Sequence, residues 1–174
     1  MQQSVPAFTD MLAGCRGSAL HLEMRDVYAV GDEAEEFQAW RKGHRTDWED
    51  RESWWHPYYQ AVSEAVARGV RVRRARVVSE PVSEYIRYEH FITRANVIAG
   101  EQVRWLPRRR ATDLALPGND FWLFDERIVR VNHFSGEGAM LTPEVREEPA
   151  LAKLCADAFE AVWERAVPHE EYQV

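Results

Sequence analysis

Two apolar, aromatic-rich runs stand almost back to back over residues 121–134 (FWLFDERIVRVNHF), separated only by the polar residues 125–127. Turn-forming residues bound this stretch on both sides. Two such runs joined by a short polar segment predict a β-hairpin whose apolar side chains need a surface to cover them. The next segment supplies that surface, because apolar residues recur at helical spacing over 150–167 and predict an amphipathic closing helix.

The rest of the chain predicts a mixed sheet with flanking helices. Strands are expected over 19–24, 70–78 and 102–106, and helices before Gly14 and over 33–42, 57–68 and 81–99. A right-handed crossover through the last of these helices makes its two flanking strands parallel neighbours. The predicted fold class is therefore α+β, in a single domain over 1–174. Within it, 1–56 forms a helix, a strand, a helix and a Trp-rich loop, and 57–168 forms an α/β core.

Periodicity also predicts which side chains are buried. In the first strand Leu20 and Leu22 alternate with His21 and Glu23, as in a half-buried strand. The arginines of 70–78 imply that one side of that strand faces water or a partner. The tail after residue 168 is expected to be loose. The predicted buried stripe of the closing helix is Leu151, Leu154, Ala158, Val162 and Ala166.

Composition restricts the class of protein. The chain has 174 residues, 45% of them hydrophobic, and a formal charge of −7. No apolar run approaches the roughly twenty residues that cross a bilayer, and no signal-peptide pattern opens the chain, so a cytoplasmic protein without membrane contact is expected. Its two cysteines, Cys15 and Cys155, are expected to be reduced. The acidic balance argues against a general polyanion binder, although one basic face would still permit nucleic-acid contact.

Motifs for catalysis and metal binding are missing from the sequence, which has no GxSxG, GxGxxG, GxxxxGK[ST] or HExxH pattern. We therefore expect no catalytic residue set, no metal and no cofactor. His133 in the hairpin and Asp125 in its turn are candidate binding residues. Each also has a structural interpretation, as a hydrogen-bonded strand end and as a turn former.

Arginines gather in the middle third of the chain. The candidate binding residues among them are Arg73, Arg74, Arg76 and Arg104. If their two strands are neighbours, they form one basic patch for a phosphate or an acidic protein surface. The alternative is pairing with nearby acids such as Glu89 and Glu101.

A polar segment over 44–56 carries Trp48, Trp54 and Trp55. Exposed together, these rings would anchor a protein interface, because aromatic residues dominate binding hot spots. Enclosing a cavity, they would instead line a ligand pocket. The sequence leaves both interpretations open.

Four strings carry a resemblance to a known family: LEMRDVY (22–28), RRARVVSEP (73–81), NVIAGE (96–101) and NDFWLFDER (119–127). On these strings the chain resembles, over almost its whole length, an uncharacterised actinobacterial domain-of-unknown-function family, number 6879. Members are often encoded beside helix-turn-helix regulators. The resemblance implies a regulatory role as the partner of a DNA-binding protein.

The second half is also similar to one half of a phospholipase D-like fold, with an aspartate-bearing hairpin and a closing helix that carries Trp163. Active members of that family need the motif HxKxxxxD. If Asp125 matches its aspartate, Gly118 stands at the histidine position and Asp120 at the lysine position. Without the nucleophile, the resemblance implies a scaffold reused for binding.

The leading hypothesis is a non-enzymatic regulatory module that binds a protein, a helix-turn-helix regulator, through its basic strands or its Trp-rich loop. One alternative is a small-molecule sensor with an aromatic pocket. A second alternative is a divergent phosphodiesterase-like enzyme, which requires His133, Asp125 and an arginine to converge on one point.

Overall fold

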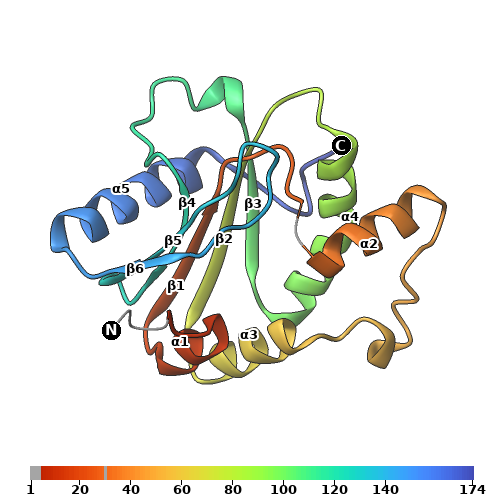
Figure 1. The fold of residues 1–174 in the computed structure, drawn as a ribbon, viewed down its shortest axis with the longest axis horizontal. Helices are drawn as coiled ribbons and strands as arrows, with labels where there is room; N and C mark the ends of the chain where they lie inside the picture. The colour runs from red at the N-terminus through yellow and green to blue at the C-terminus, as the bar shows by residue number, and fades with distance from the viewer. Residues whose placement is uncertain (1–4, 30) are drawn as a thin grey trace.

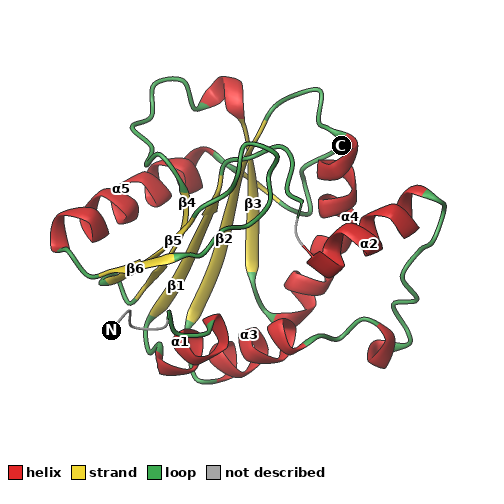
Figure 2. Ribbon diagram, viewed as in Figure 1, coloured by secondary structure: helices red, strands yellow, loops and turns green. Residues whose placement is uncertain are grey.

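The computed structural model describes residues 5–29 and 31–174. Over these residues the chain forms a single α+β domain of five α-helices around a seven-stranded mixed sheet (Figures 1 and 2), which confirms the predicted fold class. The helices are α1 (Phe8–Gly14), α2 (Gly31–Arg41), α3 (Pro57–Ala67), α4 (Glu84–Ala99) and α5 (Pro149–Arg165). The strands are β1 (Ser18–Glu23), β2 (Arg71–Val78), β3 (Gln102–Pro107), β4 (Asp120–Phe124), β5 (Ile128–Asn132), β6 (Glu144–Arg146) and β7 (Val167–Pro168).

The sheet has the order β6-β5-β4-β1-β2-β3-β7. Strands β1, β2 and β3 are parallel, and the other neighbouring pairs are antiparallel. Helix α4 connects β2 to β3 as neighbours, in the register Arg73 to Gln102, so the predicted crossover is confirmed. Within the described residues, no helix has the length and hydropathy required to span a bilayer.

The predicted hairpin is β4 and β5. Its closing pair is Phe124 and Ile128, and two residues of the turn, Asp125 and Glu126, have positive φ of 51° and 56°. Strand β4 also pairs with β1, with Leu22 opposite Phe121. The hairpin is therefore joined to the middle of the sheet rather than appended at its edge.

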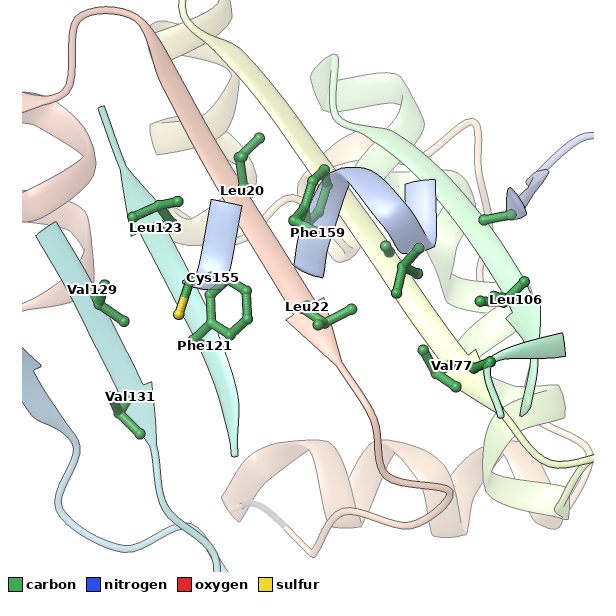
Figure 3. Packing of buried hydrophobic residues seen from close by; sticks show 14 of the residues in the cluster. Leu20, Leu22, Val77, Leu106, Phe121, Leu123, Val129, Val131, Cys155 and Phe159 are labelled. Atoms are coloured by element: carbon green, nitrogen blue, oxygen red, sulfur yellow. The ribbon is translucent and has the colours of Figure 1, made fainter. Parts of the chain in front are cut away.

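Helix α5 covers one face of the sheet, as predicted for the closing helix. Figure 3 shows Phe159 and Cys155 among the side chains of the central strands. The buried residues of this core are Leu20, Leu22, Ala75, Val77, Leu106, Ala111, Phe121, Leu123, Val129, Val131, Ala152, Cys155, Phe159, Val162 and Ala166. The predicted stripe was partly wrong, because Leu154 is 45% exposed. The contact face is rotated toward Ala152 and Cys155, whose small side chains let the helix approach the sheet closely.

Helices α1, α3 and α4 lie across the opposite face (Figure 1). This cover overturns two exposure predictions. The strand β1 is not half-buried, because it lies in the centre of the sheet and His21 is only 6% exposed. The strand β2 is covered on both sides as well, and Arg74 and Arg76 are 7% and 3% exposed.

Two local features fix the ends of α4. The side chain of Ser83 accepts a hydrogen bond from the Ile86 backbone N–H at 3.1 Å, so the helix begins at Glu84 rather than at the predicted residue 81. At the other end Gly100 has φ of 101°, a conformation that glycine adopts without steric cost.

The C-terminal tail is packed rather than loose. The ring of Tyr172 stacks on Trp105 with centroids 5.5 Å apart, and its backbone oxygen lies 2.9 Å from His90 Nε2. Tyr172 is 6% exposed. The prediction of a loose tail was therefore wrong: an aromatic side chain near the terminus found a buried partner on β3.

Candidate ligand-binding site

Polar and charged side chains occupy the face of the central strands that α5 does not cover. Because side chains alternate along a strand, the residues between the apolar core positions of β1, β2, β4 and β5 all point to this side. They line a cavity of about 380 Å³ together with α4, α3 and the loop after β5. We call it the sheet-face pocket, lined by Phe8, His21, Glu23, Tyr28, Glu33, Tyr58, Arg74, Arg76, Tyr85, Glu89, Asp120, Trp122, Arg130, Asn132, Phe134 and Met140.

Arg74 lies at the base of the pocket and is held by three acceptors. Its Nε donates to Glu101 Oε1 at 2.7 Å, and its terminal nitrogens donate to Glu23 Oε1 at 3.2 Å and to the Tyr58 hydroxyl at 2.6 Å. Although burial alone lowers it, these partners, Glu101 first, hold the pKa of Arg74 above its usual range. The guanidinium is therefore a fixed positive charge.

Arg76 stands beside Arg74 and bridges two acids. It pairs with Glu23 through one terminal nitrogen and with Glu89 Oε2 at 2.6 Å through the other. Its Nε has no hydrogen-bond partner in the described segments. A buried ion pair stabilises a fold little, because desolvation cancels most of the attraction. The pair is therefore better explained by the site that it shapes.

His21 is a buried residue whose polar side-chain atoms make no hydrogen bond in the described part of the chain. Neither ring nitrogen has a hydrogen-bond partner among the described residues, and Glu23 Oε1 is 3.7 Å from Nε2. Burial, with Arg74 and Arg76 close by, lowers the pKa of His21 well below its usual value, so the ring is neutral and the approach to Glu23 is no ion pair. The imidazole stacks on Trp122 with ring centroids 4.2 Å apart and belongs to a residue that lines the pocket; a neutral imidazole has one donor and one acceptor.

A shared proton lies between α2 and α4. The Tyr85 hydroxyl is within hydrogen-bonding distance of Glu33 Oε1 and, at 2.7 Å, of Glu89 Oε1. A hydroxyl has one hydrogen, so one of the two carboxyl groups must carry a proton and donate it. Burial, followed by the charge of Glu89, raises the pKa of Glu33 to about 9, which identifies Glu33 as the protonated partner at neutral pH.

Asp120 contributes another carboxyl group at the end of β4. It accepts hydrogen bonds from the Tyr28 hydroxyl and, at 2.9 Å, from the Met24 backbone N–H. Burial raises the pKa of Asp120 to about 6 in spite of these donors. The acids Glu33, Glu89 and Asp120 therefore all line the pocket, bonded to the neighbouring tyrosines Tyr85 and Tyr28, and two of them hold protons more strongly than free carboxyl groups.

The four arginines predicted to form one patch are separated by strand alternation. Arg74 and Arg76 face the pocket, whereas Arg73 and Arg104 face α5. Arg73 donates to both oxygens of Glu160, at 2.6 and 3.3 Å. Arg104 donates to the Trp163 backbone oxygen at 3.0 Å, and its guanidinium lies 4.4 Å from the Trp163 ring centroid.

The three tryptophans of the loop before α3 pack against one another. The ring centroid of Trp54 is 5.2 Å from that of Trp48 and 5.7 Å from that of Trp55, and Trp54 is 7% exposed. Trp48 and Trp54, with Trp40 of α2, line a second cavity of about 680 Å³, the aromatic cavity. The indole N–H groups of Trp40 and Trp54 are buried without a partner in the described segments, whereas that of Trp55 donates to Gln60 at 2.8 Å.

Asp125 and His133 lie at opposite ends of β5 and do not converge. The carboxylate of Asp125 accepts the backbone N–H groups of Arg16, Gly17 and Ser18, which closes the loop before β1. Partial burial works in the opposite direction, but the Gly17 and Arg16 donors hold the pKa of Asp125 below its usual value. His133 Nε2 lies 3.3 Å from Glu144 Oε2 on β6.

Sequence reasoning missed most of the pocket. His21 and Glu23 were assigned to a solvent-facing side, and Asp120, Glu33 and Tyr85 were not predicted as site residues. One partial signal was available: parallel strands are usually covered on both faces, so the arginines at alternate positions of the predicted parallel strand 70–78 suggested a buried polar site. Among the described residues, no three His, Cys, Asp or Glu side chains form a cluster suited to a metal ion.

Together the fold and the pocket define an α+β domain with a buried, charged cavity on one face of its sheet. The chain belongs to the family DUF6879, a domain of unknown function, which matches residues 6–174. No curated protein matches the sequence. Among solved structures, the archaeal chromatin protein TrmBL2, described as showing a novel mode of DNA binding, is similar with a TM-score of 0.47 and 14% identity. That match covers 91% of this chain and 47% of TrmBL2.

Proposed function

We propose that this domain binds a small molecule in the sheet-face pocket and acts as a regulatory ligand-binding module rather than as an enzyme. The observation that carries the proposal is His21, a neutral imidazole that is 6% exposed and has no hydrogen-bond partner among the described residues. Burying a polar group without a partner costs free energy, on the order of 1–3 kcal/mol. A ligand that accepts from one ring nitrogen and donates to the other would recover that cost.

Other features of the pocket support binding over catalysis. Its cavity of about 380 Å³ falls in the range of small-molecule sites. Two of its three arginines, Arg74 and Arg76, are already bonded to acids, which leaves them little capacity for a transferred phosphate. Burial raises the pKa of both thiols, Cys15 and Cys155, to about 11, so neither is an activated nucleophile. The same burial of Arg74 and Arg76 gives no support to direct nucleic-acid contact.

A screen of small polar fragments against ¹⁵N-labelled protein tests the proposal. Fragments that bind are expected to shift the backbone resonances of His21 and Glu23 and the indole resonance of Trp122. Binding that leaves these signals unchanged and shifts only the aromatic cavity would contradict the assignment of the site, and a screen without any binder would contradict the function.

A matched pair of variants sharpens this screen. His21→Leu removes both ring nitrogens from the pocket, whereas His133→Leu makes the same change at a histidine that does not line it. Fragment affinity is expected to fall roughly tenfold or more in His21→Leu, the value of one or two lost hydrogen bonds. It is expected to stay unchanged in His133→Leu.

A protein partner, a helix-turn-helix regulator, is the second candidate function. The observation that favours it is a small apolar surface at the rim of the same pocket, where Val27, Met140 and Leu141 are 50%, 48% and 50% exposed. The segments that carry these residues are joined by a bond from Ala29 N–H to Gly138 O of 2.9 Å. A partner on this rim would sense whether the pocket is occupied.

Co-purification with a helix-turn-helix regulator encoded beside the gene tests this second candidate. The double variant Met140→Glu, Leu141→Glu is expected to abolish the complex. Val174→Glu, which places the same charge on another side chain that is 48% exposed, is expected to leave it intact. Failure of the unmodified chain to capture the regulator would reject this candidate.

A further inference from the structure

The acidic end of the sheet-face pocket contains more carboxyl groups than positive charges to balance them. Glu33, Glu89 and Asp120 line this end, and Arg76 is the guanidinium in contact, through Glu89 Oε2 at 2.6 Å. Arg76 is also shared with Glu23. Glu33 holds a proton at neutral pH, so the charges that remain are those of Glu89, which shares Arg76 with Glu23, and of Asp120, whose pKa is raised by burial although the nearby Arg25 lowers it.

Arg130, the remaining arginine of the pocket, lies away from these acids. It stands opposite Trp122 in the β4–β5 register, and its terminal nitrogen donates to the Pro6 backbone oxygen at 2.9 Å. No carboxylate pairs with it among the described residues. The pocket thus has an acidic end and a cross-strand row through His21 and Trp122 that carries the guanidinium groups of Arg74 and Arg130.

Aromatic rings enclose the acidic end. The centroid of Tyr28 lies 6.0 Å from that of Tyr85 and 5.1 Å from that of Phe134. The hydroxyl groups of the two tyrosines bond to the same acids, Tyr28 to Asp120 and Tyr85 to Glu33 and Glu89. Carboxyl groups framed by aromatic faces attract an organic cation both by charge and by the ring quadrupoles.

We propose that the sheet-face pocket binds an organic amine, with its ammonium group among Glu33, Glu89 and Asp120 and its body toward His21 and Trp122. This inference rests on the proposed ligand-binding function and names the ligand class. At the end where the ammonium is placed an anion is disfavoured, because the guanidinium there, Arg76, is already paired with Glu23 and Glu89. The unpartnered nitrogens of His21 then bond a polar group elsewhere on the amine.

Amine binding at this position displaces the proton of Glu33. The groups that face this carboxyl are Tyr85 and Glu89 of α4 and Arg76 of β2, and the Tyr28 ring beside Tyr85 connects them to Asp120. The ammonium group then neutralises the Glu33 carboxylate, which a bound proton neutralises in the free protein. Between pH 7 and 8.5, where Glu33 holds its proton and the amine stays charged, affinity rises roughly tenfold per pH unit if one proton leaves.

Matched fragments that differ only in charge provide the test. The probes are 2-phenylethylamine, 2-phenylethanol and phenylacetate, with butylamine, butanol and butyrate as a smaller set, titrated by calorimetry at pH 7.5. The amines are expected to bind at least tenfold more tightly than the alcohols and acids of the same set. Titration in two buffers of different ionisation enthalpy is expected to report the release of one proton.

Two glutamates of α2 give matched variants. Glu33→Gln keeps the size and the donor of the protonated carboxyl, so the fold is retained, and it is expected to weaken amine binding about tenfold and to remove proton release. Glu35→Gln changes an exposed neighbour on the same helix and is expected to alter neither. Asp120→Asn is a second variant at the acidic end and is expected to weaken amine binding as well.

The outcomes separate the two levels of the proposal. Tighter binding of the alcohols or acids, or amine binding that neither releases a proton nor responds to Glu33→Gln, overturns the amine assignment and leaves the ligand-binding function standing. A loss in Glu35→Gln alone places the ammonium in the aromatic cavity and also overturns it. If fragments of every charge fail to bind, both proposals fall.

Discussion

The strands β1, β2 and β4 present two unlike faces. Toward α5 they carry leucine, valine, alanine and phenylalanine in a closed apolar core. Toward the other helices the same strands carry His21, Arg74, Arg76 and Asp120, which are buried but polar, and the partly buried Glu23. Both faces have the same backbone and a similar degree of cover, so the difference lies in the side chains alone.

The apolar face toward α5 stabilises the fold, whereas we infer that the polar side chains of the opposite face serve binding. Apolar burial of about 25 cal/mol per Å² explains the α5 face as a source of stability. The opposite face has its own apolar cluster, with Ala19, Val72, Trp122 and Phe124 from these strands. Its buried ion pairs and unpartnered imidazole give little or negative net stability, so the polar part of that face is not explained by folding. We therefore expect substitutions in the α5 core to lower the unfolding free energy strongly, and substitutions in the sheet-face pocket to weaken ligand binding.

The largest effect is expected from truncating the α5 core. Phe159 is fully buried, and Phe159→Ala would leave a cavity among the side chains of β1, β2 and β4. The unfolding free energy is expected to fall by about 3–5 kcal/mol. Urea unfolding monitored by circular dichroism measures it, and a loss below about 1 kcal/mol would show that this face does not hold the fold together.

A smaller loss is expected from the acid beneath the pocket. Glu101 is 2% exposed and accepts bonds from Arg74, from Asn96 at 2.7 Å and from Tyr58 at 3.0 Å. Glu101→Gln leaves the Arg74 charge buried without its main partner and is expected to cost about 3 kcal/mol. Such a loss would show that breaking one buried ion pair destabilises the fold, even though the intact pairs contribute little net stability. An unchanged urea midpoint would contradict that view.

The pH dependence of stability isolates Glu33. Its pKa is raised from 4.5 to about 9 in the folded protein, so the native state keeps a proton that the unfolded state loses. Stability is therefore expected to fall as pH rises from about 5 to 9, by at most about 1.4 kcal/mol per pH unit for one proton. In Glu33→Gln this part of the slope is expected to disappear. Identical pH profiles for the two proteins would contradict the protonation of Glu33.

The outer surface of α5 should respond least. Lys153 and Asp157 form an exposed pair at 2.5 Å one turn apart, with side chains 75% and 67% exposed. Lys153→Ala is expected to change the unfolding free energy by less than about 0.5 kcal/mol. This variant sets the baseline against which both faces are compared in the same urea experiment. A loss of more than 1 kcal/mol would mean that surface charge, not the core, dominates this helix.

The elements that sequence predicts best are those set by local patterns. The hairpin over 121–134, the crossover through α4 and the closing helix were all predicted, because each depends on periodicity and turn residues within a short stretch. The buried stripe of α5 was only partly predicted, since two overlapping stripes satisfy helical spacing. Contact with the sheet selected the one that contains Ala152, Cys155 and Phe159.

The pocket was beyond sequence reasoning for a non-local reason. Its residues come from β1, β2, α4 and β4, and only the strand order brings these elements together. The position of β1 between β2 and β4 buries His21 and partly buries Glu23, which were expected to be surface residues. Alternation along β2 likewise divides the arginines, which a linear pattern shows as one cluster.

The unfolding free energy of His21→Leu at pH 7 shows whether the polar side chains of the sheet-face pocket are kept for ligand binding or for stability. Leucine fills a similar volume and removes an imidazole whose nitrogens have no partner among the described residues. If the polar face is kept for binding, the variant is expected to be as stable as the unmodified protein or more stable by up to about 1 kcal/mol. A loss of more than about 2 kcal/mol, as for a core residue, would contradict the account.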